Sequence, residues 1–272
     1  MRISDHGHAL LGFSYLPPWT VNAGVAYGTE RTLVIDTGPT ALAAATIHGY
    51  TELVRPGNGI VAINTEGHLD HVGGNDYFRR LGLDVHGHVS IQRTQADLAE
   101  DIAAYESCVA DPVRRADGEG RLPFVDTRIA NPNQPIEADT VLDLGGREAT
   151  ILLAPGHTPA NLLVWLADEG VLFVGDTISR GYRPNLGTGG PAAWTTWLAA
   201  LDRIEDLRPS VIVPGHGEVI RHAEIPVELE RTRSCLARAL DTATATQGLL
   251  HAYAEGRGLG VISSSANTVW EW

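Results

Sequence analysis

Four apolar, strand-like segments of this chain each end at residues that can bind a metal ion. The first of them follows the apolar residues 60–63. It holds four potential ligands within six residues, namely Glu66, His68, Asp70 and His71. A turn between a buried strand and a helix can fold such a run around one point. Imidazole and carboxylate groups suit zinc, iron and manganese, so the run indicates a metal site. Taken alone, it is equally explained by a polar loop with solvated histidines.

Three later segments repeat the arrangement with one ligand each. His157 follows the apolar residues 151–153 within Ala-Pro-Gly-His-Thr-Pro. Asp176 ends the segment Phe-Val-Gly-Asp-Thr, and His216 lies in Val-Pro-Gly-His-Gly. Each residue by itself is most simply a loop residue. The end of a strand is a rigid place to build a shared site, and four such segments in this order indicate that they converge.

Together these motifs resemble the metallo-β-lactamase superfamily. The first motif of that family reads Thr-His-x-His-x-Asp-His, and its later ligands lie in Pro-Gly-His-Thr, Gly-Asp and Pro-Gly-His-Gly segments. The resemblance covers roughly residues 20–220. It implies an α/β fold, a four-layer αββα sandwich, with a dinuclear metal site at one edge.

The resemblance also implies a division of the ligands between two metal ions. Two zinc ions are expected, and iron or manganese stays open. The first ion would take Glu66, His68 and His157, and the second Asp70, His71 and His216, with Asp176 bridging the two.

Glu66 stands where the family motif has its first histidine. It adds a third carboxylate, so the charge left on two divalent ions falls from about +2 to about +1. A less positive site lowers the pKa of bound water less, and oxygen ligands favour harder ions than zinc. Two interpretations follow: Glu66 is a metal ligand, or it is a general base beside a single ion.

Strand-like and helix-like segments alternate along the chain in two similar halves, which favours a two-sheet core with helices outside. The expected strands are at residues 21–27, 32–35, 60–63, 140–144, 148–153, 161–166, 170–175 and 211–213. The expected helices are at residues 40–52, 74–82, 91–107 and 192–206, followed by a helical stretch at about 222–257.

One domain over residues 1–272 is expected, because no linker interrupts the pattern. Its core would occupy about residues 20–220. Residues 109–135 are rich in glycine, proline and charge and are long for a connection, so they are expected to form a lid or an insertion.

The composition and net charge of the chain disfavour some kinds of binding partner. The chain of 272 residues has a formal net charge of −13, and all 20 basic residues are arginine. Such a surface repels phosphate backbones, so nucleic acid is not an expected partner. No apolar run approaches the length of a membrane-spanning helix, and the first residues lack an apolar leader. We therefore expect a cytoplasmic bacterial protein with a small-molecule substrate, and a homodimer stays open.

Residues around the expected site are candidates for substrate binding. Tyr182 and Arg183 follow Asp176 directly and could bind a carboxylate or stack on a ring, although a solvated loop explains them too. Trp19, with Phe13 and Tyr15, could form an opposite lip. Two further features stay open or favour a structural role. Asp36 either orients a metal ligand or caps a turn, and the pair His86 and His88 is expected to end a strand.

The function implied is metal-assisted hydrolysis of a small carbonyl substrate, such as a lactone, lactam, ester or thioester, by a metal-bound hydroxide. Asp70 would orient the hydroxide, and Glu66 is the second catalytic candidate. No serine or cysteine nucleophile motif is present. The main alternative is a cyclase or thioesterase of secondary metabolism, such as polyketide biosynthesis, on the same site. An iron-dependent oxygenase, a true β-lactamase, a nuclease and a metal-free binding module are weaker alternatives.

Overall fold

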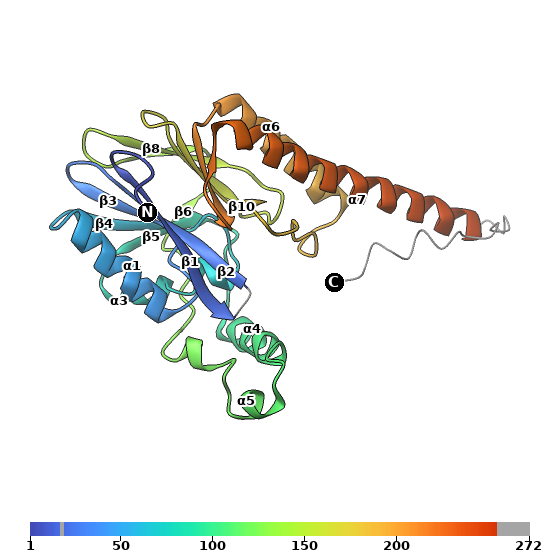
Figure 1. Cartoon of the computed structure of the whole chain (residues 1–272), viewed down its shortest axis with the longest axis horizontal. Helices are drawn as coiled ribbons and strands as arrows, with labels where there is room; N and C mark the ends of the chain where they lie inside the picture. The colour runs from blue at the N-terminus through green and yellow to red at the C-terminus, as the bar shows by residue number, and fades with distance from the viewer. Residues whose placement is uncertain (17–18, 255–272) are drawn as a thin grey trace.

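Two six-stranded sheets pack face to face in the computed structural model, which describes residues 1–16 and 19–254 (Figure 1). The first sheet runs in chain order through β1 (Gly7–Leu16), β2 (Trp19–Tyr27), β3 (Arg31–Ile35), β4 (Gly59–Ile63), β5 (Asp84–His88) and β6 (Gln134–Ile136). The second contains β7 (Thr140–Asp143), β8 (Glu148–Leu153), β9 (Leu162–Leu166), β10 (Val171–Ser179), β11 (Val211–His216) and β12 (Ile220–Arg221).

The connections explain the strand directions. β3, β4, β5 and β6 are parallel neighbours, and parallel neighbours need crossover connections. These crossovers carry α1 (Ala41–Val54), α2 (Leu69–Val72), α3 (Asn75–Arg80), α4 (Gln95–Ser107), α5 (Pro112–Ala116) and the 3-10 turn η1 (Leu122–Phe124). β7 to β10 form an antiparallel meander, whereas β10 and β11 are parallel and are joined through α6 (Pro191–Leu207). The chain then continues into η2 (His222–Glu224) and α7 (Ile225–Ala254), which runs past α6 (Figure 1).

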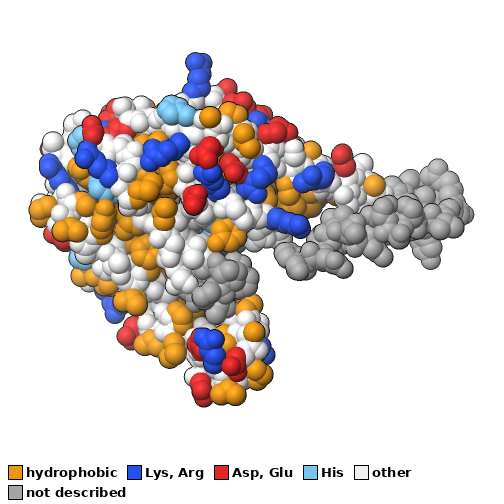
Figure 2. All heavy atoms as spheres, viewed as in Figure 1, with side chains coloured by type: hydrophobic (Ala, Val, Ile, Leu, Met, Phe, Trp, Pro, Cys, Tyr) orange, Lys and Arg blue, Asp and Glu red, His pale blue; other side chains and the backbone are white. Residues whose placement is uncertain are grey.

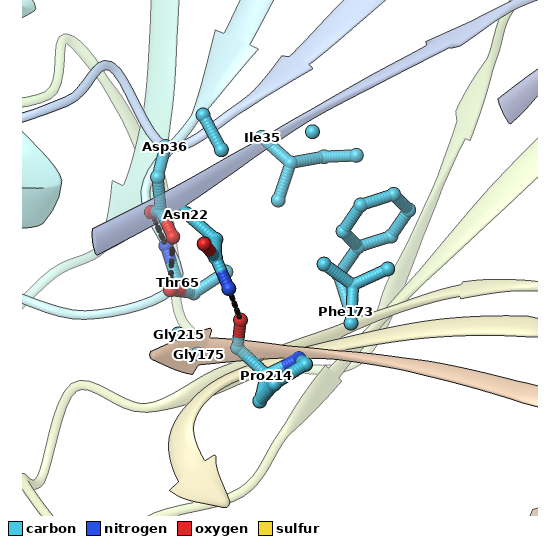
Figure 3. Close-up of a pocket in the computed structure, with 11 residues that line it drawn as sticks. Asn22, Ile35, Asp36, Thr65, Phe173, Gly175, Pro214 and Gly215 are labelled. Atoms are coloured by element: carbon cyan, nitrogen blue, oxygen red, sulfur yellow. Dashed lines mark hydrogen bonds between the residues drawn. The ribbon is translucent and has the colours of Figure 1, made fainter. Parts of the chain in front are cut away.

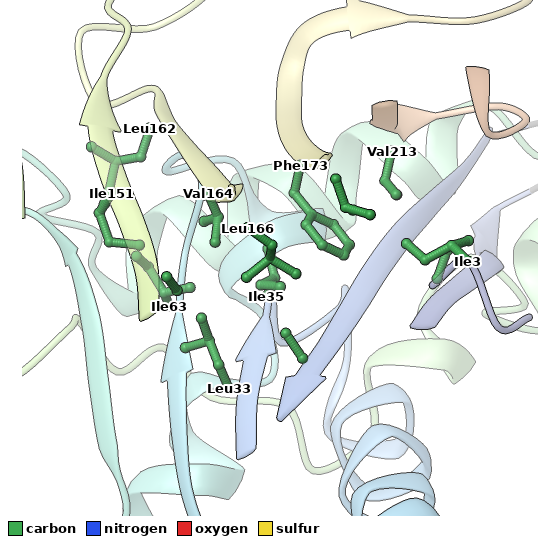
Figure 4. Packing of buried hydrophobic residues seen from close by; sticks show 14 of the residues in the cluster. Ile3, Leu33, Ile35, Ile63, Ile151, Leu162, Val164, Leu166, Phe173 and Val213 are labelled. Atoms are coloured by element: carbon green, nitrogen blue, oxygen red, sulfur yellow. The ribbon is translucent and has the colours of Figure 1, made fainter. Parts of the chain in front are cut away.

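Three layers of apolar contacts hold the sandwich together. The space between the sheets is filled from both sides, by Leu33, Ile35, Ile63, Ile151, Leu162 and Phe173 among others (Figure 4). On the outer face of the first sheet, Val34 packs with Ile47 of α1 and Phe78 of α3. On the outer face of the second, Leu172 packs with Trp197 of α6 and Leu229 of α7. The layers are therefore αββα, and the expected fold is confirmed.

The structure differs from the expected elements at the edges of the sheets. β1 and β6, which lie at the two edges of the first sheet, and the two-residue β12 were not expected. His86 and His88 do lie at the end of a strand, as expected, because β5 ends at His88. Both pair with the unexpected β6, His86 with Gln134 and His88 with Ile136. A three-residue strand containing a proline gives no periodic signal, so this partner could not be expected from the sequence.

The stretch at residues 109–135 is an ordered insertion. Val109 and Phe124 are buried with Val21 of β2 and Leu69 of α2, and the rings of Tyr105 and Phe124 stack at 5.5 Å. Its outer surface is charged and apolar together (Figure 2), with exposed residues such as Val113, Leu122 and Val125.

The helical stretch expected at about residues 222–257 agrees with η2 and α7 up to Ala254. Residues 255–257 lie outside the described residues. Among the helices that the structure describes, none combines the length and hydropathy that crossing a bilayer requires.

Candidate metal centre

The seven expected metal ligands come together at one edge of the sandwich. Glu66 and His68 lie in the loop after β4, and Asp70 and His71 lie in the short helix α2. The second sheet supplies the other three: His157 from the loop between β8 and β9, Asp176 within β10, and His216 at the end of β11. Their donor atoms fall into three groups whose members are all within 4.8 Å of one another.

The first ligand set contains Glu66, His68 and His157. Glu66 Oε1 is 2.7 Å from His68 Nδ1, and His68 Nδ1 is 3.2 Å from His157 Nε2. Glu66 Oε2 is 3.6 Å from His157 Nε2. Three donors at such separations can share one ion, because ligand atoms around a tetrahedral ion lie about 3.4 Å apart.

The second ligand set contains Asp70, His71 and His216. Asp70 Oδ2 is 3.7 Å from His71 Nε2 and 3.4 Å from His216 Nε2. Asp176 lies among both sets, with Oδ1 3.2 Å from His71 Nε2. Its Oδ2 is 3.0 Å from His216 Nε2 and 3.6 Å from His157 Nε2. The position of Asp176 suits the bridging role that the resemblance implied.

The donor atoms fit divalent cations. Glu66 and His71 are fully buried, and Asp176 is nearly so. Three of their atoms find no hydrogen-bond partner within the described part of the chain: Glu66 Oε2, His71 Nε2 and Asp176 Oδ1. Buried polar atoms are otherwise almost always paired, and buried carboxylates need a compensating positive charge. Divalent ions between the two sets would satisfy all three atoms.

Protons take the place of that positive charge in the metal-free protein. Burial alone would raise the pKa of Glu66, but the charges of His68 and His157 outweigh it and hold the pKa at about 2. Burial lowers the pKa of His68, and the charge of Glu66 reverses this effect and raises the pKa to about 9. Asp176 in the same way raises the pKa of His216 to about 10. Metal ions must displace these protons, so binding depends on pH.

Hydrogen bonds at the outer ring nitrogens orient three of the histidines. His71 Nδ1 lies 2.9 Å from Asp36 Oδ2, and His157 Nδ1 lies 3.1 Å from the carbonyl oxygen of Asn185. His216 Nδ1 contacts the carbonyl oxygen of Thr20. Each ring can then donate outward from Nδ1 and direct Nε2 to the centre, where it can bind an ion once its proton is displaced, which is the usual arrangement of metal-binding histidines. His68 instead presents Nδ1.

Asp36 is the main support of the run in the first sheet. It accepts hydrogen bonds from the backbone N–H and the hydroxyl of Thr65, both at 2.7 Å (Figure 3). It also lies within hydrogen-bond distance of His71 Nδ1. The backbone at Asp36 is left-handed, with φ of 61°, which an aspartate tolerates better than most residues. Burial raises the pKa of Asp36, and the charge of His71 opposes this rise. Of the two interpretations of this residue, the structure shows the contact that orients a ligand.

Two further residues, Asn22 and Trp197, support the ligands of the second sheet. Asn22 of β2 donates to the carbonyl oxygen of Pro214 at 2.9 Å (Figure 3). It also donates to the carbonyl oxygen of Gly217 at 2.8 Å, so it ties the loop around His216 to the first sheet. Its signal was a polar residue within the apolar strand at residues 21–27. Trp197 of α6 is buried, and its ring lies 5.3 Å from the ring of His157.

Gly215 shows why glycine precedes His216. A Cβ atom at this position would lie 2.0 Å from Asp176 Oδ1, which is far inside van der Waals contact. Glycine therefore lets the backbone of β11 approach the carboxylate closely enough for His216 to reach it.

The three expected substrate-binding residues differ from one another in their surroundings. The half-buried ring of Tyr182 packs edge-on against the ring of His216 at 5.7 Å, so it forms a wall of the site. Arg183 is exposed beside it. Trp19 begins β2, and its side chain, like that of Tyr15, is outside the described part of the structure. Arg93 supports the ligand run instead, because its Nη1 donates at 3.2 Å to the carbonyl oxygen of Gly67.

Comparison with known proteins agrees with this geometry. The family model described as the metallo-beta-lactamase superfamily matches residues 16–216. The chain belongs to this superfamily. The match spans all seven residues of the centre, Glu66 included.

Among curated relatives of this superfamily member is a hydroxyacylglutathione hydrolase from a Synechococcus strain. It is 28% identical over 57% of this chain and 48% of its own length. An acyl-coenzyme A thioesterase from Gallus gallus is 25% identical over 59% of this chain and 58% of its own. The chain thus spans about half the length of these relatives. A solved metallo-beta-lactamase family protein from Thermus thermophilus shares the fold, with a TM-score of 0.65, 22% identity, and coverage of 92% of this chain and 84% of its own.

Proposed function

We propose that this member of the superfamily is a metal-dependent hydrolase of small acyl thioesters. The observation that carries the proposal is the pair of ligand sets that meet at Asp176, within reach of each other and of the surface. Two relatives named for hydrolysis of acylglutathione and acyl-coenzyme A conjugates support the thioester class. Lactones, lactams and simple esters are the competing substrates.

Glu66, His68 and His157 would hold one divalent ion, and Asp70, His71 and His216 the other, with zinc the expected metal. Ions bound here would supply Lewis acidity, which lowers the pKa of water and polarises a carbonyl group.

The chain's own residues would do the remaining work. Asp70 is nearly buried, and its Oδ2 lies 3.4 Å from His216 Nε2, where the carboxylate could accept a proton from water and orient it. The burial of Glu66 among three histidines supports a role as ligand rather than as a free base. Tyr182 would form the wall against which an acyl group packs.

A substrate panel tests this proposal. The protein loaded with Zn²⁺ or Mn²⁺ is assayed with an acyl-coenzyme A, an S-acylglutathione, a lactone, a phenyl ester and a penicillin. We expect metal-dependent release of free thiol, with the thioesters the best substrates by kcat/KM. Preference for the lactone or the penicillin would contradict the thioester class. Turnover by His216→Ala equal to that of the wild type would contradict the assignment of the metal site.

A small-molecule substrate follows from this proposal. The cyclase of secondary metabolism on the same metal centre differs from it only in the acceptor of the acyl group, and product analysis by mass spectrometry separates the two. A cytoplasmic location and a homodimer stay predictions.

A further inference from the structure

Glu66 belongs to the first ligand set, but its carboxylate also reaches the second. Its Oε1 is 2.7 Å from His68 Nδ1 in the first set and 3.3 Å from His71 Nε2 in the second. Its Oε2 is 3.6 Å from His157 Nε2 in the first set. The distances to His71 and His157, 3.3 and 3.6 Å, are near the separation of about 3.4 Å between ligand atoms that share a tetrahedral ion, whereas the contact with His68 is a hydrogen bond. The same carboxylate is therefore within sharing distance of both ion positions.

Asp176 occupies a matching position. Its Oδ2 is 3.0 Å from His216 Nε2 in the second set and 3.6 Å from His157 Nε2 in the first. Its Oδ1 is 3.2 Å from His71 Nε2. His71 thus has one oxygen of Glu66 and one of Asp176 at nearly equal distances, and His157 likewise has one oxygen of each at 3.6 Å. Each carboxylate thus lies close to histidines of both sets, Glu66 nearer the first set and Asp176 nearer the second.

Both carboxylates also carry an unused oxygen. Glu66 Oε2 and Asp176 Oδ1 are buried and accept no hydrogen bond from any residue that the structure describes. A carboxylate has two oxygens and can bind two ions, whereas a neutral imidazole offers a single lone pair and binds one. A histidine at position 66 could serve the first ion only. The glutamate supplies what a bridge requires.

We propose that Glu66 is a second bridging ligand, which joins the two ion positions together with Asp176. This inference rests on the proposed metal centre and changes its chemistry. Two carboxylate bridges and a third carboxylate from Asp70 make the donor set rich in oxygen, and oxygen donors favour harder ions such as Mn²⁺ over zinc. A bridging ligand also couples the two sites, so its loss should weaken the binding of both ions.

A comparison of two variants tests the bridge by metal binding alone. The metal-free full-length protein is titrated with MnCl₂ by calorimetry as wild type, His68→Ala and Glu66→Gln. His68 touches only the first set, so we expect its variant to keep the second ion with a Kd within about threefold of wild type. Glu66→Gln keeps the side-chain size and loses the charge and the bridge. We expect its remaining ion to bind at least about tenfold more weakly than that of His68→Ala. Equal Kd values in the two variants would overturn the bridge.

Glu66→His is the second variant, in case Glu66→Gln fails to fold by circular dichroism. It retains a donor for the first ion and cannot bridge. We therefore expect this variant to bind two ions, with the affinity for the second ion about tenfold weaker than in wild type. An unchanged affinity for the second ion would again overturn the bridge. Wild type that binds two ions while the variants show no such weakening would reject the bridge and leave the proposed function standing. Wild type that binds neither Mn²⁺ nor Zn²⁺ would reject both.

Discussion

The two sheets contribute to the metal centre in different ways. The first sheet supplies one run, residues 66–71, which is supported by buried hydrogen bonds that Asp36 accepts and that Asn64 donates. The second sheet supplies single residues from three separate segments. Their support is backbone carbonyl groups, the side-chain hydrogen bonds of Asn22 and the packing of Trp197. A compact run can be positioned by a polar network, whereas dispersed ligands depend on the packing of the whole sheet and its helix.

Removing one histidine from each side should have the largest effect, and the same effect. We expect His68→Ala and His216→Ala each to lower kcat/KM by more than about 100-fold, because loss of a direct ligand exceeds the loss from its supporting groups. Steady-state kinetics with the best thioester checks this. If one variant kept activity within about tenfold of wild type while the other did not, the two contributions would not form one site.

Trp197 tests the packing that supports the dispersed ligands. Its ring is buried and lies against Gly156 and His157. We expect Trp197→Ala to lower the free energy of unfolding by about 3–5 kcal/mol in urea denaturation, because it leaves a large cavity. Trp197→Phe is the matched control. It loses the hydrogen bond from the indole to the carbonyl of Thr177 and leaves a smaller cavity, so it should cost about 1–3 kcal/mol, less than the alanine variant.

Asp36 tests the polar network that supports the run. We expect Asp36→Asn to weaken metal binding by about 10–100-fold, because His71 loses its charged hydrogen-bond partner. Competition with a chromogenic chelator measures the change. Asp139→Asn, which alters a surface carboxylate paired with Arg203, should leave the affinity unchanged. A similar loss in both variants would show that the network around Asp36 has no special part in the site.

The metal-free protein should lose stability as the pH rises. The pKa values of His68 and His216, about 9 and about 10, lie above the ordinary value of about 6.5. Their protonated forms therefore stabilise the fold fully below about pH 6.5, and this stability is lost as the pH rises through 9 and 10. We expect the Tm of the metal-free protein to fall over this interval. Metal affinity should rise over the same interval as the protons leave. A Tm independent of pH would contradict this assignment.

The smallest effect should come from Arg183, the exposed residue that follows Tyr182 in the chain. Arg183 is solvent-exposed, where a charge contributes about 0–1 kcal/mol. We expect Arg183→Ala to raise KM by at most about fivefold with kcat unchanged. A loss of kcat would place Arg183 in the chemistry instead of at the rim.

The same contrast explains what the sequence could predict. The ligand run and the three single ligands were recognisable because each follows an apolar strand and carries donor residues at fixed positions. Asn22 and Trp197 look like ordinary residues of a strand and a helix, and only tertiary packing brings them to His216 and His157. β6 was missed because it is a short strand containing proline, whose place is set by its pairing with β5. Glu66 could be marked as unusual, but its position between both ligand sets required the structure.

Metal content per chain tests the central claim most directly, which is that ligands from both sheets form one dinuclear centre. The wild-type protein, His68→Ala and His216→Ala are loaded, dialysed and measured by elemental mass spectrometry. We expect about two ions per chain in the wild type and about one in each variant. One ion in the wild type, or two retained in either variant, would contradict the account.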